Sequence, residues 1–156
     1  MTTDQQSLAK IETVEILKTI DIAAPIEIAF EAMIDELGPE AQMPDGTPMP
    51  FQLEAWPGGR WFRDLGNNAG HLWGHVQVIK PPTLLEICGP LMMSYPAVNH
   101  VQYRFTAQGG GTRLAFVHRG LGLISPDHRE GMPKGWGHWM DKIRTRAERQ
   151  TTLGKK

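Results

Sequence analysis

The sequence predicts an α+β domain in which a long C-terminal helix rests on a seven-stranded antiparallel sheet. Three observations support this fold class: a strand and a helix open the chain, six short strands separated by turn signals follow, and an amphipathic helix closes it. The 156 residues, 40% of them hydrophobic, fit a single domain over residues 1–156 with an ordered core at about residues 11–150. We find neither internal repeats nor a second domain.

The first two elements follow from hydrophobic periodicity. Residues 12–22 alternate between apolar and polar side chains, as a half-buried strand does. Pro25 then opens a helix with an apolar stripe at helical spacing, which ends at Gly38 and Pro39. Residues 38–50 contain four prolines and two glycines, so we expect an irregular loop that could act as a lid.

Turn signals rich in glycine, proline and asparagine divide the next part of the chain at hairpin spacing. After the last strand, Ser125 and Pro126 begin a short turn, and the final helix is expected over residues 134–149. Its apolar stripe must rest on the sheet. The predicted strands are residues 51–56, 60–65, 71–79, 84–88, 99–107 and 112–121.

The stretch HLWGH contains two histidines, His71 and His75, at a spacing that would suit a metal ion on a helix. Alternation of apolar and polar residues around them indicates a strand, where their α-carbons would lie about 13 Å apart. One zinc ion cannot bridge them, so we expect no metal here and place both histidines on the outer face with Trp73. Cys88 is the only cysteine, which excludes an intrachain disulfide and a multi-cysteine metal site.

Composition argues against several classes of partner. The net charge of −1 and the pI near 6.6 provide no field that would attract nucleic acid. No apolar run approaches a membrane span, and residues 1–7 are polar, so we expect a cytoplasmic protein without a membrane partner.

Residues 1–80 carry a net charge of −7 (12 acidic, 5 basic) and residues 81–156 a net charge of +6 (5 acidic, 11 basic). We expect these halves to pack together, and the alternative is that a basic tail docks on an acidic partner: Lys142, Arg144, Arg146, Arg149, Lys155 and Lys156.

Several stretches occur in an order that resembles a known family: KTIDIAAPIEIAFEAM, PGGRW, GHVQVIKPPTLLEI, GGTRLAFVHRGL and GWGHWMDKI. They are similar to motifs of the SRPBCC superfamily (START, polyketide cyclase and Bet v 1-like proteins), in particular its branch named after the activator of Hsp90 ATPase (AHSA1-like). The resemblance implies a helix-grip fold, in which the curved seven-stranded antiparallel sheet wraps around the long C-terminal helix. It also implies a ligand cavity between the sheet and this helix, and it transfers no catalytic residue. Residues 38–50 and 88–100 depart from the family spacing near the expected cavity mouth, which implies a ligand particular to this protein.

The lining of such a cavity can be read from strand alternation and from the helix stripe. It would be an apolar, aromatic wall with a few polar points, the composition of a small-molecule pocket. The alternative is that the same side chains form a fully packed core. The predicted ligand-binding residues are Val76, Val78, Ile87, Tyr103, Phe105, Phe116, His118, Trp136, Trp139 and Met140.

His118 is the best catalytic candidate because it ends an inward apolar stripe and matches a family position. The alternative is a structural histidine bonded to backbone. Acid–base chemistry would pair it with Asp64 or Glu54, and an inward Arg63 would anchor a carboxylate or phosphate, although an exposed arginine is the commoner case. Cys88 is expected to be a small buried hydrophobe and not a nucleophile.

These observations leave three hypotheses for function. The first is a binding protein for a hydrophobic or aromatic small molecule, acting as carrier, sensor or scavenger. The second is a cyclase, dehydratase or hydrolase that uses His118 in the same cavity. The third is an interaction module whose outer face, with Trp73, or basic tail meets a chaperone-type partner. No cofactor is expected, and whether the chain is an enzyme or forms a homodimer is left open.

Overall fold

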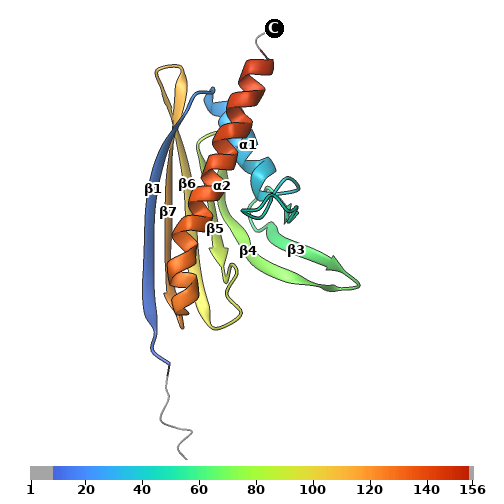
Figure 1. Ribbon diagram of the computed structural model, residues 1–156, viewed down its shortest axis with the longest axis vertical. Helices are drawn as coiled ribbons and strands as arrows, with labels where there is room; N and C mark the ends of the chain where they lie inside the picture. The colour runs from blue at the N-terminus through green and yellow to red at the C-terminus, as the bar shows by residue number, and fades with distance from the viewer. Residues whose placement is uncertain (1–8, 155–156) are drawn as a thin grey trace, which may run out of the picture.

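The computed structural model describes residues 9–154; the polar N-terminal segment and Lys155 and Lys156 of the basic tail lie outside the described residues. Seven strands form one antiparallel sheet in the order β1-β7-β6-β5-β4-β3-β2, with two helices (Figure 1). The predicted α+β helix-grip architecture is confirmed. The elements are β1 (Glu12–Ile22), α1 (Ile26–Leu37), β2 (Gln52–Leu53), β3 (Arg60–Gly66), β4 (Ala69–Lys80), β5 (Leu84–Gly89), β6 (Ala97–Gln108), β7 (Gly111–Gly122) and α2 (Pro126–Leu153).

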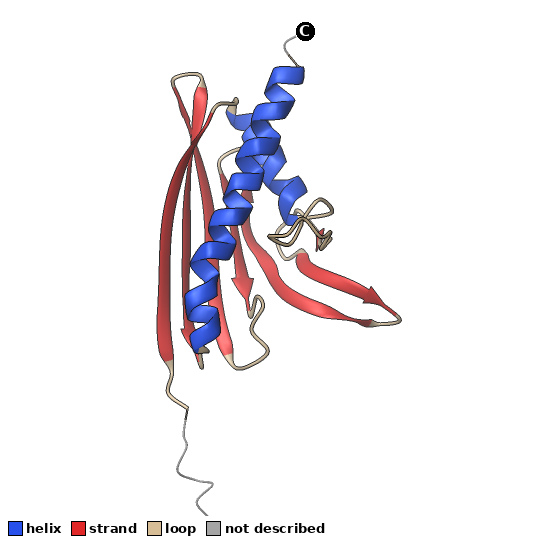
Figure 2. Cartoon of the chain, in the orientation of Figure 1, coloured by secondary structure: helices blue, strands red, loops and turns tan. Residues whose placement is uncertain are grey.

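Both helices lie on the same face of the sheet, and α2 runs along it beside α1 (Figure 2). The core between these layers takes the apolar stripe of α1 and the inward residues of the long strands. Two buried indoles fasten the end of α1, since Trp139 Nε1 donates to the Glu36 carbonyl and Trp61 Nε1 to the Leu37 carbonyl, each at 2.7 Å. These bonds satisfy two carbonyl groups that a helix C-terminus leaves without partners.

The loop between α1 and β2 is irregular, as expected, but it is held by its own backbone. Met49 N–H donates to the Ala41 carbonyl at 2.9 Å, and Phe51 N–H donates to the Gly38 carbonyl at 3.0 Å. Phe51 is buried at the end of the loop. The loop is therefore anchored at its base against α1 and the core.

The C-terminal helix begins earlier than predicted. Ser125 caps it as expected, with its Oγ accepting the His128 N–H at 3.1 Å, but residues 126–133 continue as helix and do not form a separate turn. Pro133 lies inside α2. Its missing N–H removes a single helical hydrogen bond, and burial of Met132 and Trp136 on either side favours continuation of the helix.

Strand β4 contains two bulges that change which side chains face the core. Trp61 pairs with Gly74 and Phe62 with Leu72, so Trp73 is an extra residue. Val76 pairs with Ile87 and Val78 with Glu86, so Gln77 is a second one. Because each extra residue inverts the alternation beyond it, two predictions were wrong: Trp73 packs against the core, and Val78 lies on the outer side with Glu86.

The acidic and basic halves of the chain do interleave, as predicted. Five ion pairs join them, whereas the basic residues of α2 that were considered as a docking tail are partly engaged within the protein. The pairs are Asp21–Arg113, Glu15–Arg119, Glu12–Arg129, Glu36–Arg146 and Glu40–Arg146.

Among the described residues, no helix has both the length and the apolar character needed to cross a membrane.

Candidate functional site

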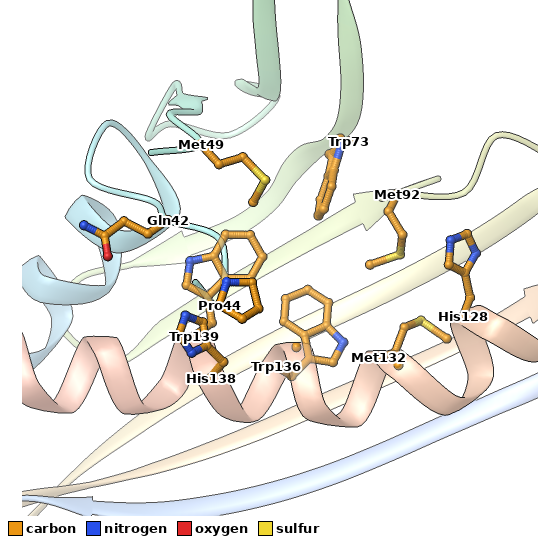
Figure 3. A pocket seen from close by; sticks show the side chains of 12 residues that line it. Gln42, Pro44, Met49, Trp73, Met92, His128, Met132, Trp136, His138 and Trp139 are labelled. Atoms are coloured by element: carbon orange, nitrogen blue, oxygen red, sulfur yellow. The ribbon is translucent and has the colours of Figure 1, made fainter. Parts of the chain in front are cut away.

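A pocket of about 270 Å³ lies between α2, the loop after α1, strand β4 and the loop between β5 and β6 (Figure 3). Segments far apart in the sequence therefore meet at one place. Its lining residues are Gln42, Pro44, Met49, Trp73, Met92, His128, Gly131, Met132, Gly135, Trp136, His138 and Trp139.

Six of the twelve lining residues of the pocket are tryptophans or methionines. Trp136 and Trp139 stack with ring centroids 5.6 Å apart and an interplanar angle of 20°. Trp73 meets Trp139 edge-to-face at 6.1 Å, so the three rings form one continuous surface. Flexible methionine side chains adapt to the shape of an apolar ligand, and three of them surround the rings: Met49, Met92 and Met132.

Two glycines on α2 keep the floor of the pocket open. Gly131 and Gly135 are one helical turn apart and both line the pocket. A Cβ added at either position would meet no atom within 4 Å. Glycine inside a helix costs about 0.8–1.0 kcal/mol relative to alanine, so this floor is kept open at the expense of helix stability.

Polar groups occur at three points of the lining. Gln42 Oε1 accepts from Lys142 Nζ at 3.0 Å. His138 Nε2 is buried and has no hydrogen-bond partner within residues 9–154. His128 Nδ1 lies 2.7 Å from the Tyr95 hydroxyl. The pocket therefore has an apolar centre and histidines at its border, and no group of three or more potential metal-ligating side chains occurs among the described residues.

The ten predicted ligand-binding residues fall into three groups according to where they lie in the structure. Trp136 and Trp139 line the pocket. Val78 lies on the outer side of the sheet. The remaining ones are buried in the packed core behind the pocket: Val76, Ile87, Tyr103, Phe105, Phe116, His118 and Met140.

His118 is completely buried, and both of its ring nitrogens are bonded. Trp136 Nε1 is 3.0 Å from Nδ1, and Asn99 Oδ1 is 2.7 Å from Nε2. An indole N–H can only donate and an amide oxygen can only accept, so the ring is neutral with its proton on Nε2. Burial lowers the pKa of His118 to about 4, which favours this neutral form.

Asn99 continues the network from His118 to the loop after β5. Its Nδ2 donates to the Gly89 carbonyl at 3.2 Å and approaches the Met93 sulfur at 3.4 Å. Gly120 makes room for it, since a Cβ there would lie 2.2 Å from Asn99 Oδ1. His118 thus holds the pocket residue Trp136 and, through Asn99, the loop that carries Met92.

The other predicted polar residues are not gathered around His118. Glu54 forms an ion pair with Arg60 at 2.8 Å, and hydrogen bonds from Arg60 lower the pKa of Glu54 to about 2. Asp64 Oδ1 accepts the Gly66 N–H at the tip of the β3–β4 hairpin. The Tyr103 hydroxyl is buried without a partner among the described residues, and burial raises its pKa.

Two further residues were weighed from the sequence. Arg63 is half-buried, opposite His71 in the sheet, and its Nε has no hydrogen-bond partner within residues 9–154. Cys88 is a half-buried free cysteine.

Sequence reasoning missed most of the pocket lining. The methionines of residues 38–50 and 88–100 carried a usable signal, because these segments depart from the family spacing near the expected cavity mouth. The sequence gives no signal that Trp73 lines the pocket, because its orientation follows from a bulge that interrupts strand alternation. His128 was assigned to a turn and Gly131 to no element, and the position of both depends on the early start of α2. Gly135 was placed in the helix but not in the lining.

Comparison with known proteins agrees with this architecture. Residues 23–148 match the family model described as Activator of Hsp90 ATPase homolog 1-like protein. No curated protein sequence gives a significant match.

Solved structures share the fold at low sequence identity. An uncharacterized protein from Rhizobium leguminosarum is 19% identical with a TM-score of 0.71, over 92% of this chain and 99% of that one. A protein of unknown function from Staphylococcus aureus is 16% identical with a TM-score of 0.68, over 92% and 98%. The di-domain ARO/CYC protein StfQ of the steffimycin biosynthetic pathway is 11% identical with a TM-score of 0.63, over 90% of this chain and 52% of that one. At these identities the likeness shows the fold alone.

Proposed function

Because this chain belongs to the family of Activator of Hsp90 ATPase homolog 1-like proteins, whose fold suggests a ligand-binding cavity, we propose that it binds a compact aromatic small molecule in the pocket on α2. The observation that carries the proposal is the lining: three tryptophans and three methionines around about 270 Å³. Ligand pockets usually combine such an apolar wall with a few polar groups. The role that follows is that of a carrier, sensor or scavenger.

The size of the pocket limits the ligand. An apolar cavity of about 150 Å³ holds a benzene molecule. The pocket here is larger, at about 270 Å³, and suits a ligand whose enclosed part is roughly two fused rings, with any linked third ring at the pocket mouth. Its tryptophan faces favour planar ligands, which stack on aromatic side chains.

The other two hypotheses receive less support from the site. His118, the candidate for catalysis, has both nitrogens bonded within the core. The interaction module relied on the outer face with His71, Trp73 and His75 or on the basic tail. Trp73 lines the pocket, and Arg146 of the tail pairs with Glu36 and Glu40 within the protein.

Binding of the uncharged fluorescent probe N-phenyl-1-naphthylamine tests the proposal. We expect its fluorescence to rise on binding to the wild-type protein, and its affinity to fall by about tenfold or more in Gly135→Leu, where the new side chain fills the pocket. The control is Gly137→Leu, on the same helix but outside the lining, where an added Cβ meets only the end of Lys18. Unchanged affinity in Gly135→Leu, or no binding to the wild-type protein, would overturn the proposal.

A further inference from the structure

The border of the pocket contains a histidine that is held by a tyrosine. His128 lies in the first turn of α2, beyond Met92 and Met132 as seen from the tryptophans (Figure 3). Its Nδ1 is 2.7 Å from the hydroxyl of Tyr95, which belongs to the loop between β5 and β6. The Tyr95 oxygen also accepts the backbone N–H of Ser125 at 3.2 Å. Two elements therefore fix the position of one imidazole ring.

These contacts assign the protons of the group. The Tyr95 oxygen already accepts from Ser125, and its own hydrogen has one acceptor within residues 9–154, which is His128 Nδ1. We assign Tyr95 as the donor to Nδ1 because Nδ1 is the acceptor within reach of its hydroxyl hydrogen, and the neutral imidazole then carries its proton on Nε2. No described residue bonds to His128 Nε2, so this N–H is a donor without a protein partner in a residue that lines the pocket.

We propose that His128 Nε2–H donates a hydrogen bond to an oxygen atom of the ligand, and that the ligand is accordingly an aromatic ketone or a similar aryl compound with a carbonyl oxygen. This inference rests on the proposed function and adds the chemical class of its ligand. The tryptophan rings receive the planar part, and His128, one border of the pocket, receives the oxygen. Tyr95 is a positioning residue because it acts through His128.

The surroundings of His128 strengthen such a bond. Met92 and Met132 are its neighbours in the lining, and the other polar side chains of the lining are Gln42 and His138. A hydrogen bond is stronger in an apolar environment than in water. A ligand with a methyl group in place of the oxygen would leave the N–H without an acceptor, and such an orphaned donor weakens binding.

Two probes of nearly the same shape test the inference. The probe 2-acetylnaphthalene carries a carbonyl group, and 2-isopropylnaphthalene has a methyl group in its place. Calorimetric titration should show that His128→Phe weakens binding of the ketone by about five- to tenfold and that of the hydrocarbon by less than about twofold. Tyr95→Phe should weaken ketone binding by a smaller factor, because His128 then loses the bond that fixes its proton on Nε2.

Control variants separate His128 from the other histidines. His138→Phe changes a second lining histidine, and His71→Phe changes one that is exposed on the sheet. His71→Phe should leave the ratio of the two affinities unchanged, and His138→Phe should change this ratio less than His128→Phe does. If His138→Phe abolished the preference for the ketone and His128→Phe did not, the hydrogen-bond donor would be His138. That result would overturn the inference.

The carbonyl stretching frequency of bound 2-acetylnaphthalene, labelled with carbon-13 at the carbonyl group, tests the inference on the wild-type protein without a variant. Infrared difference spectra should show the stretch at lower frequency than in an apolar solvent, and His128→Phe should remove this shift. A wild-type frequency equal to that in apolar solvent would overturn the inference while leaving the proposed function intact. Failure of both naphthalenes to bind would instead overturn the proposed function and the inference with it.

Discussion

Two histidines serve different roles in this protein, depending on their burial and on what surrounds them. The ring of His118 is bonded to Trp136 and Asn99 and is fully buried, whereas His128 keeps one nitrogen without a protein partner among the described residues. From the sequence, His118 was the stronger candidate for chemistry because it ends an apolar stripe. The alternative, a structural histidine, agrees better with its contacts, although its partners are side chains and not backbone groups.

Burial of His118 predicts a dependence of stability on pH. The unfolded chain takes up a proton near pH 6.5, but in the folded protein the pKa of His118 is about 4. Between these values the unfolded state binds more protons, so the free energy of unfolding falls as the pH is lowered through this window, by about 3 kcal/mol from this group. Below pH 4 its contribution is constant.

Urea unfolding at pH 7 and pH 4 checks this expectation. The loss of stability between the two pH values should be smaller in His118→Gln than in the wild-type protein, whatever the absolute stability of the variant. His71→Gln, which changes an exposed histidine, is the control. Equal pH dependence of the wild-type protein and His118→Gln would show that the buried ring does not set it.

At the scale of elements, α2 combines two demands that conflict. It must be a stable helix across the sheet, and its pocket face must leave room for a ligand. Gly131 and Gly135 meet the second demand at the expense of the first. Strand β4 shows a related compromise, since its bulge at Trp73 interrupts the pairing with β3 and turns an indole into the site.

This conflict predicts opposite effects of alanine on stability and on binding. Gly131→Ala and Gly135→Ala should each raise the free energy of unfolding by about 0.5–1 kcal/mol, because alanine favours the helix and its Cβ meets no atom. Both should weaken N-phenyl-1-naphthylamine binding. Gly137→Ala, which lies outside the pocket lining, should stabilise the helix without affecting the probe. Chemical denaturation and probe titration of the same three variants measure the two effects.

At the scale of the whole molecule, charge complementarity joins the first half of the chain to the second. The pairs differ greatly in burial: the side chains of Arg119 and Glu15 are 61% and 55% exposed, whereas those of Arg146 and Glu36 are 21% and 6% exposed. Arg146 lies on α2 and Glu36 on α1, so this buried pair ties the two helices together. Its Nε to Oε2 distance is 2.6 Å.

Loss of the buried pair should cost far more stability than loss of an exposed one. Arg146→Ala leaves the Glu36 carboxylate buried without its partner, and we expect a loss of about 3 kcal/mol or more in the free energy of unfolding. Arg119→Ala should cost at most about 1 kcal/mol. Replacing both partners, as in Arg146→Met with Glu36→Leu, should recover most of the loss. Urea denaturation measures the free energy of unfolding of each variant. Equal losses of stability in Arg146→Ala and Arg119→Ala would contradict the expectation.

Much of the fold could be predicted because its determinants are local. The alternation of residues 12–22, the helical stripe after Pro25 and the turn signals between later strands each depend on neighbours a few positions away. The predicted starts and ends of β1 and α1 agree with the structure. The family resemblance, which the matching family model confirms, added the arrangement of these elements, and the structure shows this arrangement.

The pocket was decided by the tertiary structure. Its lining comes from the loop around Met49, the bulge at Trp73, the loop with Met92 and the first turns of α2. Two bulges moved Trp73 and Val78 to faces opposite to those that alternation assigns, and the early start of α2 brought His128 and Gly131 into the lining.

The sequence by itself determined the order and type of the elements, since hydrogen bonding and side-chain periodicity act within a few residues. It did not determine where space would remain between them. That depends on how side chains from distant segments fill the region above α2, and strand alternation alone does not contain this information.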